Sequence, residues 1–155
     1  MVSSAVVADL SIPPTAPVLR TWLDRWNTHD LDGLRDLADP GYVHHAMNGA
    51  DLDLEGFLAG FRAVLGAFPD VAYRVEHVLT DGDLAAAFLV ATATHGGSYL
   101  GIEPTGRRVE IRGAYHCRVR DGRIVEDWDV FDLLTPAFGL GAVVGPRSDA
   151  PPAGA

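Results

Sequence analysis

The chain has 155 residues and a mass of 16.5 kDa, which is the size of one domain and leaves no room for a second hydrophobic core. Its composition, 48% hydrophobic and 21% charged, is typical of a soluble globular domain. No apolar run has the ~18 to 20 residues of a membrane span, and no secretory signal is visible, so we expect a cytoplasmic protein. The net charge is −9, and all 12 cations are arginines, which argues against nucleic-acid binding and excludes lysine Schiff-base chemistry.

The two ends of the chain differ in composition from its middle. Residues 1–12 and 145–155 are rich in Pro, Ala, Ser or Gly and have no periodicity. They predict a flexible N-terminus and a disordered C-terminal tail on either side of a single domain, residues 13–144.

The first part of this domain has the apolar spacing of helices. That spacing predicts helices over 17–28 and 31–38 and a third helix that begins near Asp53, for which Asp51 or Asp53 is the candidate cap. Between the second and third helices, residues 42–46 are typical of a short strand.

The period changes to two in the second part of the domain. It predicts four strands separated by turns, followed by a short helix or coil over 133–140; the strands are 71–79, 84–95, 109–120 and 123–131. Helices followed by a run of strands indicate an α+β fold, in which a curved antiparallel sheet wraps around the N-terminal helices. Such a sheet encloses an internal apolar pocket, which is the default position for a site.

The last predicted strand is the most unusual segment because it carries four acidic residues within 126–132. Alternation places one set of side chains on a common face: Val125, Asp127, Asp129 and Phe131. If this face lines the pocket, desolvation raises the pKa of Asp129 and makes it an acid/base near neutral pH. The alternative is that Asp127 faces solvent and Asp132 caps the segment that follows.

Histidine and cysteine are the other candidates for chemistry. His44 and His45 are adjacent on a strand, so only one of them faces the pocket, and His95 ends a long apolar strand. The histidines lack metal-ligand spacing, and the sequence has no nucleotide-binding motif, so we expect neither a metal nor a cofactor. Cys117, the single cysteine, is expected to be buried and inert.

Five segments together resemble the SnoaL-like polyketide cyclases, also called ester cyclases: residues 26–32, 42–45, 68–70, 94–109 and 118–129. The match covers about residues 17–141. The resemblance implies a cone-shaped fold like that of nuclear transport factor 2, with a hydrophobic cavity and a homodimeric or homotetrameric assembly. It also implies a cofactor-free intramolecular aldol closure.

The same resemblance assigns roles to particular residues. It implies that Asp129 is the catalytic aspartate and that His44 and His95 occupy catalytic pocket positions. Tyr115 stands where the family has another polar or histidine residue; a phenol donates a hydrogen bond but is a weak base at neutral pH. The remaining candidates for substrate binding are Asp127 and six aromatic residues for which plain core packing is the alternative: Trp22, Trp26, Phe57, Phe61, Phe88 and Tyr99.

We therefore expect a cyclase that acts on a small hydrophobic polyketide or similar natural product, with Asp129 as general acid/base. A dehydratase, an isomerase, a hydroxylase or an epoxide hydrolase on the same scaffold is the alternative, and so is a non-catalytic binding module. An epoxide hydrolase would need an arginine in the pocket, whereas alternation places Arg112 and Arg118 on the outer face.

Overall fold

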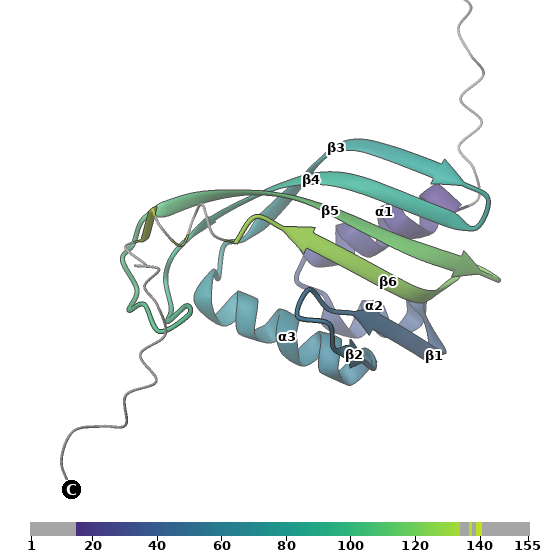
Figure 1. The fold of residues 1–155 in the computed structure, drawn as a ribbon, viewed down its shortest axis with the longest axis horizontal. Helices are drawn as coiled ribbons and strands as arrows, with labels where there is room; N and C mark the ends of the chain where they lie inside the picture. Colours follow the sequence, from purple (N-terminus) through teal and green to yellow (C-terminus); the bar gives the residue numbers. More distant parts are fainter. Residues whose placement is uncertain (1–14, 134–136, 138, 141–155) are drawn as a thin grey trace, which may run out of the picture.

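The predicted helices and strands follow one another in the predicted order, and a short strand that was not predicted, Asp51–Leu52, precedes the third helix (Figure 1). The computed structural model describes residues 15–133, 137, 139 and 140. The predicted tails, 1–12 and 145–155, lie outside the described residues, as do residues 134–136 and 138 of the segment 133–140. Within the described part of the chain, no helix combines the length and the apolar character that crossing a membrane requires.

Three helices form the first layer: α1 (Thr15–Asn27), α2 (Leu31–Leu37) and α3 (Leu54–Ala67). An aspartate caps each of the last two. Asp30 accepts a hydrogen bond from the backbone N–H of Gly33, and Asp53 accepts one from Gly56, at 2.9 and 2.8 Å. Asp53 is therefore the cap of α3, and Asp51 belongs to a strand.

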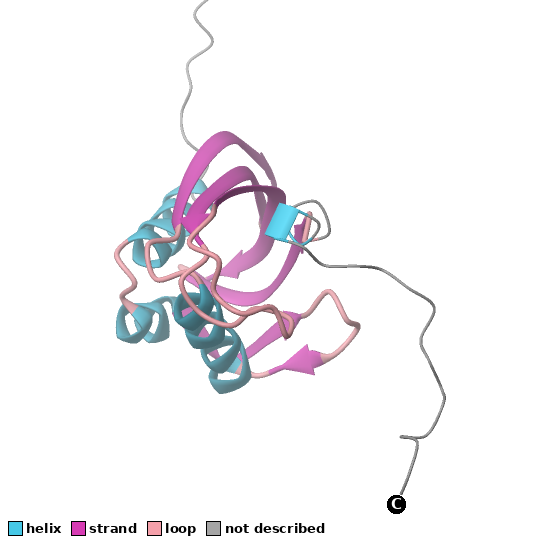
Figure 2. Cartoon of the chain, turned by 90° about the vertical axis from the view of Figure 1, so that its left-hand side faces the viewer, coloured by secondary structure: helices cyan, strands magenta, loops and turns pink. Residues whose placement is uncertain are grey.

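Six strands form a single curved sheet: β1 (Ala38–His45), β2 (Asp51–Leu52), β3 (Ala72–Asp81), β4 (Leu84–Thr94), β5 (Arg108–Arg120) and β6 (Arg123–Phe131). Their order across the sheet is β2-β1-β6-β5-β4-β3. Figure 2 shows the sheet curling around the helices, so the α+β cone is confirmed.

The sheet differs from the prediction in one respect, because it is mixed rather than purely antiparallel. β1 and β6 run parallel, with His44 opposite Asp127. A parallel pair needs a long crossover, and α3 with β3–β5 provides it. This pairing joins the first strand of the chain to the acidic last strand.

A bulge in β6 makes the predicted inward position of one residue, Val125, wrong. Val119 pairs with Ile124 but Arg118 pairs with Glu126, so Val125 is the extra residue. Ile124 is consequently fully buried while Val125 is only half-buried. Ile124, not Val125, takes the inward position that precedes Asp127.

Candidate active site

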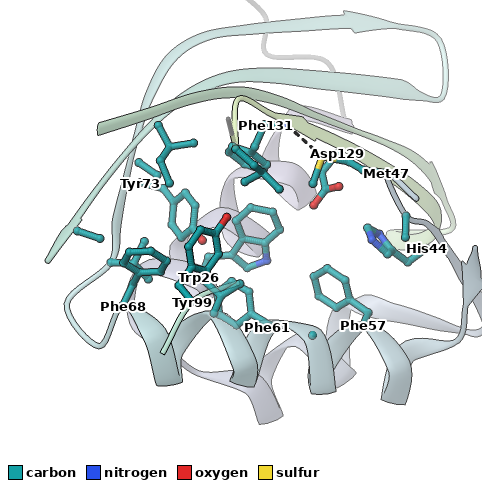
Figure 3. Close-up of a pocket in the computed structure, with 18 of the residues that line it drawn as sticks. Trp26, His44, Met47, Phe57, Phe61, Phe68, Tyr73, Tyr99, Asp129 and Phe131 are labelled. Carbon is teal, nitrogen blue, oxygen red and sulfur yellow. Dashed lines mark hydrogen bonds between the residues drawn. The ribbon is translucent and has the colours of Figure 1, made fainter. Parts of the chain in front are cut away.

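A cavity of about 560 Å³ lies between α3 and the concave face of the sheet (Figure 3). This volume is within the range of sites for small organic molecules. Aromatic side chains form much of its wall: Trp26, Phe57, Phe61, Phe68, Tyr73, Tyr99 and Phe131. The cavity therefore suits a largely apolar ligand.

Asp129 is the single acidic residue in the cavity wall, as far as the structure describes the chain. Its carboxylate points into the cavity from β6, in register with Tyr115 of β5 (Figure 3). Burial raises the pKa of the Asp129 carboxyl above its ordinary value, His44 opposes that shift, and Asp127 adds to it. The predicted carboxyl in an apolar pocket is thus present in the structure.

Asp127 lies behind the cavity wall and is fully buried. Its Oδ2 accepts hydrogen bonds from the hydroxyls of Tyr42 and Tyr115, at 2.7 and 2.5 Å. Its Oδ1 lies 2.7 Å from Nδ1 of His44. Solvent exposure of Asp127 was the wrong alternative, and Asp127 does not line the cavity as a substrate-binding residue either.

The two tyrosines act as fixed donors to this carboxylate. Burial, together with the negative charge of Asp127, raises the pKa of Tyr42 and of Tyr115 well above the ordinary value of a phenol. Both therefore keep their protons at physiological pH. The hydroxyl of Tyr115 donates its hydrogen bond to Asp127, and Tyr115 lies outside the cavity lining. Its predicted role as a substrate contact was therefore wrong.

The structure decides between the adjacent histidines of β1. His44 lines the cavity, whereas His45 stacks on Trp128 and bonds Asp51 through Nδ1 at 2.7 Å. Tyr42 was missed by sequence reasoning, although it lies two residues before His44 and so shares its face. Strand alternation was the signal that would have found it.

His95 is fully buried but is absent from the cavity lining. Its Nδ1 accepts a hydrogen bond from the backbone N–H of Thr105 at 3.2 Å, and its ring packs on Phe68 and Tyr99. The structure therefore does not bring His95 together with Asp129 and His44 in the cavity wall. The His95 ring instead packs against Phe68 and Tyr99, two aromatic residues that do line the wall.

The predicted aromatic contacts divide into two groups. Trp26, Phe57, Phe61 and Tyr99 line the cavity. Trp22 does not, because it packs deeper in the core one helical turn before Trp26. Phe88 was also placed wrongly: it is 45% exposed on the outer face of β4, since Ala87 and Leu89 take the buried inward positions.

No metal-binding cluster of three or more His, Cys, Asp or Glu side chains occurs among the described residues. Cys117 is buried, as expected, and burial raises the pKa of its thiol to about 12. Its thiolate is therefore disfavoured at neutral pH.

Gly113 of β5 leaves room for a residue of the cavity wall. A Cβ at this position would lie 2.2 Å from Cδ1 of Phe131. We expect Gly113→Ala to push that ring toward the cavity, to lower the free energy of unfolding by about 1–3 kcal/mol and to weaken the binding of apolar ligands. Urea denaturation and ligand titration measure the two effects. Gly66→Ala, whose methyl group meets nothing within 4 Å, is the matched control; equal behaviour of the two variants would contradict the steric argument.

Comparison with known proteins places this geometry in a family. A model of the SnoaL-like polyketide cyclases matches residues 16–137. The chain is 34% identical to IdmH, a proposed polyketide cyclase from Streptomyces antibioticus, over 84% of this chain and 99% of that one, with a TM-score of 0.76.

Two further solved structures are similar to the chain. AclR, a proposed hydroxylase from Streptomyces galilaeus, is 29% identical over 82% of this chain and 95% of its own, with a TM-score of 0.76. TsrD from Streptomyces laurentii is 25% identical over 87% and 100%, with a TM-score of 0.74. No curated protein matches the chain. From the family match and the shared fold, the chain belongs to the SnoaL-like polyketide cyclase family.

Proposed function

We propose that this protein catalyses a cofactor-independent intramolecular aldol closure on a polyketide or a similar natural-product intermediate, with Asp129 as general acid/base. The observation that carries the proposal is one carboxyl group, with a raised pKa, in the wall of an otherwise largely apolar cavity. A carboxyl whose pKa is raised by burial keeps its proton to a higher pH than a free aspartic acid does and exchanges it with a bound substrate.

Aldol closure needs little beyond proton transfer and orientation of the substrate. A carbon between two carbonyl groups loses a proton to a modest base, and the resulting enolate attacks a second carbonyl carbon of the same chain. Asp129 takes the first proton or returns one to the alkoxide that ring closure forms. His44 lines the same wall and adds an imidazole that can act on the same substrate (Figure 3).

The shape of the cavity supports the same reaction. Aromatic side chains from α1, α3 and β3 surround the space, among them Trp26, Phe61 and Tyr73. Walls of this kind fold a flexible chain so that its two reacting carbons meet, which replaces a slow encounter by a positioned one.

A product analysis tests the proposal. The protein is incubated with synthetic aromatic poly-β-ketones, and the products are identified by mass spectrometry and NMR. Ring closure gives a product with the same elemental composition as the substrate. Loss of one water without a new carbon–carbon bond would indicate a dehydratase, whereas an aldol product that loses water after closure keeps the new bond. Gain of one oxygen atom would favour the hydroxylase alternative that the similarity to AclR raises. Either the dehydrated open chain or the oxygenated product, without ring closure, would reject the cyclase.

We also propose that the protein is a homodimer that pairs through the outer face of the sheet. Phe88, Ala114 and Val130 are register neighbours across β4, β5 and β6, and Phe88 and Val130 are 45% and 65% exposed. An exposed apolar row of this kind is typical of an interface.

Charge placed in that row is expected to separate the subunits. The double variant Phe88→Asp, Val130→Asp should sediment as a monomer, because two carboxylates would be buried without partners in the interface. Thr21→Asp, on the exposed side of α1, is the control and should not change the mass in solution. Analytical ultracentrifugation measures both; a dimeric double variant would place the interface elsewhere.

A further inference from the structure

A second carboxylate, hidden behind the cavity wall, holds the histidine that faces the cavity. Asp127 is 0% exposed, and both of its oxygens are engaged: Oδ1 by His44, and Oδ2 by Tyr42 and Tyr115. It therefore has no free oxygen for a substrate. Its hydrogen-bonded connection to the cavity therefore runs through His44, which lines the cavity.

The contact fixes the position of the proton on the His44 ring. A carboxylate has no proton to donate, so Nδ1 of His44 is the donor to Oδ1 of Asp127. In neutral His44, Nε2 then carries a lone pair, and this is the nitrogen that the contact with Asp127 leaves for the cavity lined by His44. The ring is also held from the side by Phe57, at a centroid distance of 5.0 Å.

We infer that Asp127 positions His44 as the base of the reaction and that Asp129 supplies the acid. The inference deepens the proposed function and rests on it, because it divides between two residues the two proton transfers that aldol closure needs. Asp127 is a positioning residue, and His44 and Asp129 are the groups that meet the substrate.

The electrons and protons balance in this scheme. Nε2 of His44 takes a proton from the acidic carbon, and the electron pair of that C–H bond forms the enolate. The enolate carbon bonds to the second carbonyl carbon, whose π pair moves onto oxygen, and the Asp129 carboxyl gives that oxygen its proton. The imidazolium, stabilised by Asp127, returns its proton to Asp129, and the product is an isomer of the substrate.

Hydrogen exchange separates the base from the acid. Ethyl benzoylacetate has acidic α-hydrogens but no second ketone on which to close, so its exchange in D₂O, followed by NMR, reports the base alone. We expect the wild-type protein and Asp129→Asn to accelerate this exchange. Asp127→Asn and His44→Gln should reduce the acceleration by about 100-fold or more. Loss of exchange in Asp129→Asn with retention in Asp127→Asn would overturn the assignment.

The ring proton is observable without any substrate. Long-range ¹H–¹⁵N NMR of the wild-type protein should show His44 protonated at Nδ1. In Asp127→Asn, the two tyrosine hydroxyls keep the amide oxygen, so the amide NH₂ faces Nδ1 and moves the ring proton to Nε2. A neutral wild-type ring protonated at Nε2 would refute the positioning role, and this result needs only the wild-type protein, whether or not Asp127→Asn folds well.

The outcomes also separate this inference from the proposed function. If the wild-type protein closes rings while Asp127→Asn keeps full exchange and turnover, the inference fails and the cyclase stands. If no ring closes but exchange depends on His44 and Asp127, the cyclase fails and the base assignment stands.

Discussion

Replacement of Asp129 by asparagine is expected to reduce turnover by about 10²–10⁴-fold, the contribution that one general acid/base makes. The amide keeps the shape of the carboxyl group but neither gives up nor accepts a proton at physiological pH. Steady-state rates of ring closure measure the loss. Asp36→Asn makes the same chemical change on the exposed side of α2 and should leave turnover unaltered.

The rate of ring closure is also expected to depend on pH, through the ionisation of Asp129. Burial raises the pKa of Asp129, and as the acid it must be protonated. The rate should therefore fall as the pH rises through this pKa, and the residual rate of Asp129→Asn should lack that limb. A wild-type profile without an ionisation between about pH 4 and 8 would count against a tuned carboxyl.

Asp129→Asn should not lose its activity through unfolding. A carboxyl whose folded pKa lies above its unfolded value of about 3.9 contributes stability below that pH and loses it as the pH rises through the folded pKa. At pH 7 the charged Asp129 carboxylate is therefore less favourable in the cavity wall than a neutral side chain of the same shape. Thermal unfolding should give Asp129→Asn a midpoint equal to or above that of the wild type.

The fold was predictable where one face of a strand is apolar and the other polar. In β5, alternation places Tyr115 inside and the arginines outside, and Arg118 indeed pairs with Asp83 and Glu126 on the outer face. In β4, both faces carry apolar residues, so nothing in the sequence says that Phe88 points outward. A bulge, as at Val125, shifts the phase with no local signal.

The site was predictable only in part, for a related reason. The inward face of Asp129 follows from its spacing to Phe131, within one strand. The partners of Asp127 do not follow, because Tyr42 lies 85 residues away and meets it only through the parallel pairing of β1 with β6. Sequence reasoning expected antiparallel neighbours alone and so had no means of placing β1 beside β6.

Asp127→Ala is expected to lower the free energy of unfolding by about 3–5 kcal/mol, which is a large part of the stability of a domain of this size. The substitution removes a buried carboxylate that accepts hydrogen bonds from Tyr42, Tyr115 and His44. Each donor would then be buried without a partner, and this desolvation penalty exceeds the cost of the small cavity. Urea denaturation at pH 7 measures the change.

The companion variants identify the unpaired donors as the cause. Asp127→Asn keeps an oxygen for the tyrosines and should lose less stability than Asp127→Ala. Adding Tyr42→Phe and Tyr115→Phe to Asp127→Ala removes two of the stranded hydroxyls, so part of the lost stability should return even though the triple variant has fewer polar groups. If the triple variant were less stable than Asp127→Ala by the sum of the single Tyr→Phe effects, packing volume rather than hydrogen bonding would account for the loss.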